Sequence, residues 1–158
     1  MIYFNRLRVF LTIVTVLVTF PEAIAQTQPD IVTLTMPGEI KWRPGREPGV
    51  QTAVVAGSTA PGYLYVVRTR IPADLKVMPH THPNDRIYTV ISGIFYVGFG
   101  DEFKPDELKA FPVGSIVLVP GKVSHFHWAK SGDYEVQVSG VGPVTAEYVS
   151  PGNDPKKK

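Results

Sequence analysis

The sequence predicts an all-β protein with a single domain, folded as a sandwich or a closed barrel. Short runs rich in Val, Ile, Tyr and Phe recur from residue 62 onward and are separated by Gly, Pro or Asp, which is typical of strands joined by tight turns. Only residues 101–112 have a helical composition, and Pro105 allows at most one or two turns there. A chain of 158 residues with 44% hydrophobic and 19% charged residues can bury one core.

The first 25 residues have the pattern of a secretory signal peptide. Two arginines precede an apolar run over residues 9–20, and Pro21 and several small residues follow it up to Ala25. The run is shorter than the roughly 20 residues that span a bilayer. We therefore expect cleavage after Ala25, no stable membrane insertion of the processed chain, and a secreted or periplasmic bacterial protein.

Net charge and cysteine content bear on the partners of the protein and on what stabilises it. Removal of the leader takes away two arginines and one glutamate, and the chain that remains is nearly neutral, which does not favour a nucleic-acid partner. The sequence has no cysteine, so the stability of a small secreted domain must come from its core, an oligomer interface or a bound metal.

The elements are expected in this order along the chain. Residues 26–61 form an N-terminal extension with short strands at 31–35 and 51–55. Residues 62–150 form the barrel, and residues 151–158, which end in three lysines, form a disordered basic tail. The runs of the barrel are GYLYVVRTRIP, RIYTVISGIFYVGFG, GSIVLVPG and YEVQVSGVG.

All 4 histidines lie in two pairs of identical spacing, His80 with His82 and His125 with His127. On a strand, residues two apart share a face, so each pair directs two imidazoles the same way. Neutral imidazole is the commonest metal ligand in proteins. If the shared face is the inside of a small barrel, the two pairs predict a metal site.

Two stretches around these pairs resemble the two motifs of the cupin family. In residues 79–93, His80, His82 and Gly93 fit the first motif, and Arg86 stands where that motif has a glutamate. In GSIVLVPGKVSHFHWA, the first glycine, Pro120 and His125 fit the second motif, whereas Lys122 replaces a glycine and Ala129 an asparagine. The resemblance covers about residues 63–149.

The resemblance implies a jelly-roll β-barrel that holds one divalent metal ion. His80, His82 and His125 match metal ligands of the family, and the metal is Fe, Mn, Zn, Ni or Cu. Arg86 cannot replace the glutamate, because a guanidinium has no lone pair to donate. The resemblance therefore leaves a three-histidine site with open positions, similar to the cupin thiol dioxygenases and acetylacetone dioxygenase, or a site in which His127 is a fourth ligand. Asp85 has the wrong strand parity and is expected in a turn.

The remaining candidates are Arg86, Tyr88 and His127, which we predict as catalytic residues. Arg86 shares strand parity with His80, so it should point inward and grip an anionic substrate, or else pair with an internal acid. The acids considered are Asp101, Glu102 and Glu135. Tyr88 follows on the same face as Arg86, and His127 is a candidate base beside the metal.

These residues support three functions. The first is a metal-dependent dioxygenase of a small organic acid or diketone. The second is a non-catalytic cupin that binds a small anion or sugar acid, which a saturated four-histidine site would favour. The third is a sugar isomerase or epimerase with His127 and Tyr88 as an acid and base pair. Each implies a small, anionic ligand, and the family resemblance also implies a homodimer.

Overall fold

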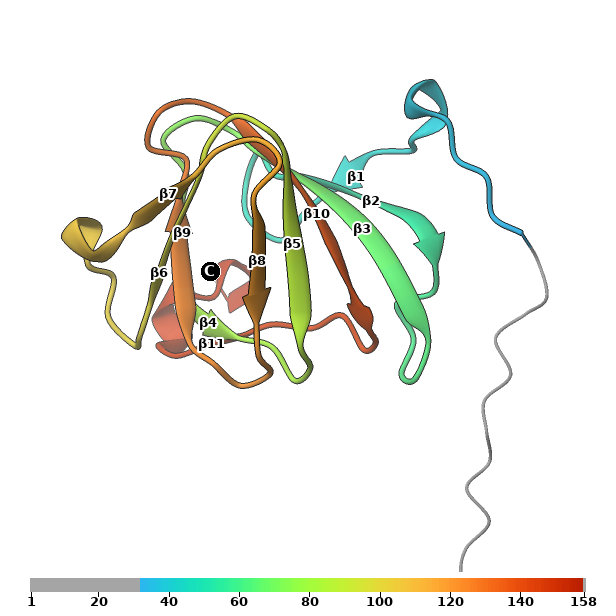
Figure 1. The fold of residues 1–158 in the computed structure, drawn as a ribbon. Helices are drawn as coiled ribbons and strands as arrows, with labels where there is room; N and C mark the ends of the chain where they lie inside the picture. The colour runs from blue at the N-terminus through green and yellow to red at the C-terminus, as the bar shows by residue number, and fades with distance from the viewer. Residues whose placement is uncertain (1–31, 158) are drawn as a thin grey trace, which may run out of the picture.

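The computed structural model describes residues 32–157 and shows two antiparallel β-sheets that face each other (Figure 1), which confirms the all-β jelly-roll prediction. The predicted signal peptide lies outside the described residues. In order across the sheet, the six-stranded sheet contains β1 (Arg43–Pro44), β2 (Gln51–Gly57), β3 (Leu64–Ile71), β10 (Tyr134–Val141), β5 (Arg86–Ser92) and β8 (Ile116–Val119). The five-stranded sheet contains β11 (Glu147–Tyr148), β4 (Lys76–Thr81), β9 (His125–Trp128), β6 (Phe95–Phe99) and β7 (Lys109–Phe111).

The other regular elements are single 3-10 turns. They are η1 (Pro37–Glu39), η2 (Pro105–Glu107), η3 (Pro151–Asn153) and η4 (Pro155–Lys157). The turn η2 is the only helical element in residues 101–112, as Pro105 predicted. Within residues 32–157, no helix has the length and apolar character needed to cross a membrane.

The core forms where the inner faces of the two sheets meet. Alternate residues of β5 point inward, so Tyr88 and Val90 are buried whereas Ile87, just before Tyr88, is exposed. The facing strand β6 contributes Phe95 and Val97, both fully buried. Apolar side chains from both sheets thus fill the space between them, and burying each stabilises the fold by about 1.5–3 kcal/mol.

The N-terminal extension differs in part from its prediction. Residues 51–55 are in β2 as expected, and β2 pairs with β3 from Gln51 to Gly57, so the six-stranded sheet begins well before residue 62. The described residues 32–35 form no strand. Val32 and Leu34 are 82% and 83% exposed, and these apolar side chains gain no burial that would favour a strand there.

The C-terminal residues also differ from the predicted disordered tail. The turns η3 and η4 order residues 151–157, and Asp154 is buried. Its carboxylate pairs with the guanidinium of Arg46, with 2.6 Å between Oδ2 and Nη2. The prolines and lysines of residues 151–158 predicted a solvated tail. The sequence alone did not reveal that Asp154 pairs with the distant Arg46.

Candidate metal centre

The histidine pairs lie on neighbouring strands of the five-stranded sheet. His80 is in β4, and His82 comes directly after the last residue of that strand. His125 and His127 are in β9. Strands β4 and β9 are antiparallel, and His80 pairs with His125 across them. All four imidazoles are buried. The sequence therefore predicted correctly that the two pairs converge.

Three of the histidines form a compact group. The metal-binding nitrogen atoms of His80, His125 and His127 lie within 4.8 Å of one another. The ring centroids of His80 and His125 are 4.4 Å apart, and those of His80 and His127 are 5.5 Å apart. The ring of His82 is adjacent, 4.9 Å from that of His80 and 5.2 Å from that of His125.

Hydrogen bonds hold the rings in a state that suits metal binding. The Nδ1 atoms of His80, His82 and His125 donate to backbone carbonyls at 2.8, 2.6 and 3.1 Å. Since a carbonyl only accepts, these Nδ1 atoms carry the proton and the Nε2 atoms keep their lone pairs. Bonds of this kind orient the ligands of metal sites. The residues present thus fit a divalent metal ion.

Burial keeps the four rings neutral. It lowers the pKa of His80 to about 3, of His82 to about 2 and of His125 to about 4. Burial also holds the pKa of His127 well below its usual value. The positive charge of the Arg86 guanidinium lowers the pKa of His82 further. Neutral imidazole is the form that ligates a metal.

Arg86 lies where the first cupin motif has its glutamate. It begins β5, is only 7% exposed, and donates from Nη2 to the carbonyl of Thr145 at 3.0 Å. Its buried Nε has no hydrogen-bond partner in the described part of the chain. Glu135, which had been a candidate partner, pairs instead with Arg68 and Arg70. The other two candidates, Asp101 and Glu102, are exposed.

Tyr88 is buried between the histidines. Its hydroxyl lies 3.4 Å from Nε2 of His82 and 3.4 Å from Nε2 of His125, so it can donate to either. Burial raises the pKa of Tyr88 to about 12, which keeps the hydroxyl protonated at neutral pH. Its ring stacks on that of Phe95 at 5.4 Å.

Asp85 has the turn role that its strand parity predicted. It is exposed, and its carboxylate accepts a hydrogen bond from the backbone N–H of Gly121 at 2.8 Å. The next residue, Lys122, has a φ of 65°, a left-handed conformation that favours glycine. Lys122 thus takes the left-handed conformation at the position where the second cupin motif has a glycine.

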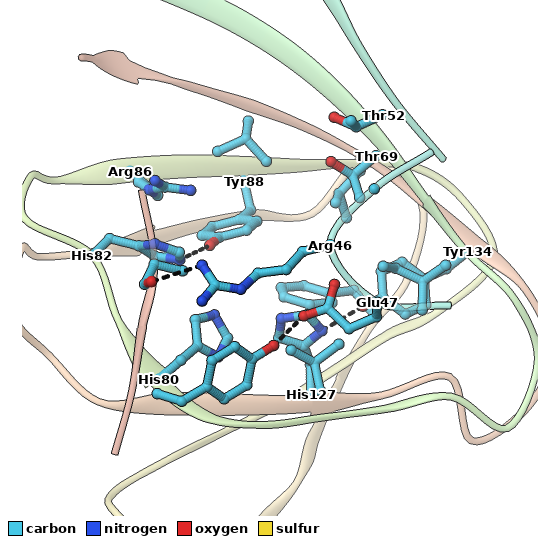
Figure 2. Close-up of a pocket in the computed structure, with 18 residues that line it drawn as sticks. Arg46, Glu47, Thr52, Thr69, His80, His82, Arg86, Tyr88, His127 and Tyr134 are labelled. Carbon is cyan, nitrogen blue, oxygen red and sulfur yellow. Dashed lines mark hydrogen bonds between the residues drawn. The ribbon is translucent and has the colours of Figure 1, made fainter. Parts of the chain in front are cut away.

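Three of the histidines, His80, His82 and His127, line a cavity of about 180 Å³ together with Arg86. Figure 2 shows this cavity with residues that the sequence motifs had not indicated. Arg46 and Glu47 enter it from the loop between β1 and β2, and Tyr148 enters it from β11. The hydroxyl of Tyr148 donates to the carboxylate of Glu47. Arg46 and Glu47 lie in the turn-forming stretch RPGREPG, where no spacing linked them to the distant histidines.

Known proteins add information on the fold alone. No protein-family model matches the sequence, and no curated protein matches it. Among solved structures, KdgF from Halomonas sp. is 23% identical with a TM-score of 0.57, covering 70% of this chain and 94% of that one. The polyketide cyclase RemF from Streptomyces resistomycificus is 16% identical with a TM-score of 0.62, covering 80% and 92%.

A third similar structure is an RmlC-like cupin from Shewanella frigidimarina, 15% identical with a TM-score of 0.55, covering 72% of this chain and 95% of that one. A protein from Klebsiella pneumoniae with a TM-score of 0.51 is described as having a double-stranded β-helix domain. These likenesses lie below 25% identity, so they show the architecture and not the activity. The chain has the double-stranded β-helix fold of the cupins.

Proposed function

We propose that the protein is a metal-dependent cupin dioxygenase that acts on a small organic acid or diketone. The observation that carries this proposal is the pairing of a neutral histidine cluster with Arg86, whose buried Nε has no partner among the described residues. A buried donor of this kind is costly until a ligand satisfies it.

The charge of the site favours an anion. The histidines are neutral ligands, so a divalent metal ion held by them would keep its full charge. Arg86 adds a further positive charge beside them, and within residues 32–157 no carboxylate pairs with it. A carboxylate or enolate oxygen accepts charge-assisted hydrogen bonds from a guanidinium. We infer that Arg86 orients such a group of the substrate.

The size of the cavity favours a small substrate. Sites for drug-sized ligands have volumes of roughly 300–1,000 Å³, and this cavity has about 180 Å³. It is lined by polar side chains and also by apolar ones, of which Val77, Phe95 and Val136 are examples. An organic acid or diketone of a few carbon atoms suits this space.

His80, His125 and His127 would hold the metal, with His82 adjacent. A redox-active metal such as iron would supply the activation of oxygen that a dioxygenase needs. The protein's own residues would bind and orient the anion through Arg86, donate a hydrogen bond from Tyr88, and exclude bulk water by burial. The sequence also suggested His127 as a base, but as a ligand it would have Nε2 on the metal and Nδ1 held by Tyr134 at 2.6 Å, which leaves no free nitrogen to take a proton.

The test combines metal analysis with oxygen uptake. We expect the chain from Gln26 onward to hold about one equivalent of metal and, with Fe(II), to consume oxygen with some small carboxylates or diketones. Arg86→Gln should keep the metal but raise KM by about 10- to 100-fold, since it removes a charge-assisted contact. Arg43→Gln, which changes an exposed arginine in β1, is the control. A protein without metal after reconstitution contradicts the proposal.

One observation favours a second candidate, a non-catalytic cupin that captures a small anion. His82 lies close enough to His80 and His125 to join them, and four imidazoles can complete a tetrahedral metal site. The same experiment separates the two functions. A metal-loaded protein that binds small anions but consumes no oxygen with any metal supports the binding function.

The proposal includes a location outside the cytoplasm and a homodimer. The first is supported by the signal-like composition of residues 1–25. The second is supported by exposed apolar side chains on the outer face of the six-stranded sheet, including Ile87, Ile116 and Leu118. N-terminal sequencing of the protein from its native source and light scattering of the processed chain test these two points.

A further inference from the structure

We infer that Arg46 is a second anion-binding residue of the cavity and that the substrate carries two acidic groups. This inference rests on the proposed function, because it assigns the second group to the same ligand that Arg86 binds. It goes further by giving Arg46 a part in specificity.

The first observation is that both arginines are attached to one short piece of backbone. Nη2 of Arg86 donates to the carbonyl of Thr145 at 3.0 Å, and Nη1 of Arg46 donates to the carbonyl of Ala146 at 2.9 Å. Consecutive Cα atoms are 3.8 Å apart, so these two nitrogen atoms lie within roughly 12 Å of each other. One small molecule with an acidic group at each end can span this distance.

The second observation is that Arg46 is held in place with donors to spare. Its Nε and Nη2 donate to the two carboxylate oxygens of Asp154, at 3.2 and 2.6 Å. Its guanidinium lies over the ring of Tyr148, 5.2 Å from the centroid. A guanidinium has five N–H groups. The bonds to Asp154 and Ala146 use three of them and leave two.

The third observation is that the guanidinium of Arg46 faces the cavity. Arg46 lines the cavity, whereas Asp154 is not among the lining residues. The carboxylate therefore fixes the guanidinium from outside the cavity. Figure 2 shows the guanidinium of Arg46 reaching across the cavity toward His82, while Glu47 from the same loop lies beside Tyr134. Glu47 is held by the hydroxyl of Tyr148, so both arginines keep donors that an acidic ligand can use.

Succinate and butyrate are suitable probes, since they have equal carbon numbers and differ by one carboxylate. Isothermal titration of the metal-loaded protein gives the ratio of the two dissociation constants. We expect succinate to bind about tenfold or more tightly in the unaltered protein. In Arg46→Gln the ratio should fall to about 1–2, and in Arg86→Gln both anions should bind more weakly.

Arg68→Gln is the matched control. Arg68 pairs with Glu135 and has 25% side-chain exposure, against 24% for Arg46, but it does not line the cavity. The ratio of the dissociation constants of butyrate and succinate should be the same in Arg68→Gln as in the unaltered protein. Because each ratio is measured within one preparation, a loss of folded protein does not change it.

The outcomes separate this inference from the proposed function. An unchanged ratio in Arg46→Gln, or equal binding of the two anions by the unaltered protein, overturns the inference and leaves the role of Arg86 intact. A metal-loaded protein that binds neither anion contradicts the anion site as a whole.

Discussion

Nδ1 of His127 lies 2.6 Å from the hydroxyl of Tyr134, and this hydrogen bond joins the two sheets of the barrel. His127 is in β9 of the five-stranded sheet, and Tyr134 begins β10 of the six-stranded sheet. Both side chains are buried. The position of one member of the metal group therefore depends on how the two sheets pack.

Replacing Tyr134 by Phe should weaken metal binding by about 10- to 100-fold, because the hydroxyl orients the His127 ring. Competition with a chelator measures the affinity. Tyr65→Phe is a matched control, since Tyr65 is equally buried and its hydroxyl has no partner in the described residues. That control should keep its metal affinity and lose no stability. Equal affinities in both variants would show that Tyr134 does not orient His127.

Single histidine variants should rank the ligands. His80→Ala and His125→Ala should abolish metal binding, since these two rings are closest together. His127→Ala should weaken binding more than His82→Ala, because His127 and not His82 belongs to the group within 4.8 Å. Metal content after dialysis measures this. The reverse order for His82 and His127 would instead support His80, His82 and His125, the ligands that the two cupin motifs imply together.

The metal-free protein should lose stability as the pH falls below 6.5. Burial lowers the pKa of His80 to about 3 and of His125 to about 4, whereas histidines of the unfolded chain titrate near 6.5. Between these values the unfolded state binds more protons, so acidification favours unfolding. The expected loss between pH 7 and 5.5 is about 1 kcal/mol for each buried histidine.

Urea denaturation of the metal-free protein at several pH values measures this loss. His82→Gln removes one titrating group, whose pKa burial lowers to about 2, and should show a shallower decline. An unfolding free energy that is the same at pH 7 and 5.5 would mean that the histidines are accessible to protons in the folded state.

Asp85→Ala should destabilise the fold by about 1–3 kcal/mol, since it leaves the N–H of Gly121 without its charged acceptor. Because this bond ties the first histidine motif to the turn before β9, metal affinity should fall as well. Asp101→Ala changes another exposed aspartate and serves as the control. If the two variants unfold at the same denaturant concentration, the bond contributes nothing measurable.

Most of the fold and half of the cavity could be predicted from local patterns. The alternation of buried and exposed residues in β5 follows from its sequence, and the spacing of His80 and His82 predicts a shared face. Arg46, Glu47 and Asp154 could not be predicted in this way. Their positions depend on pairing between segments far apart in the chain, and the short-range composition of those segments indicates only turns.

The contact between Arg46 and Asp154 joins residues 108 positions apart, and this separation affects how the protein should be produced. Contacts between distant residues require closure of a long loop, so they tend to form late in folding. The guanidinium of Arg46, which lines the cavity, is therefore fixed in place only once the segment around Asp154 has docked. A purification tag fused a few residues after Asp154 would adjoin this contact, and a tag placed ahead of residue 26 is the better choice for ligand measurements.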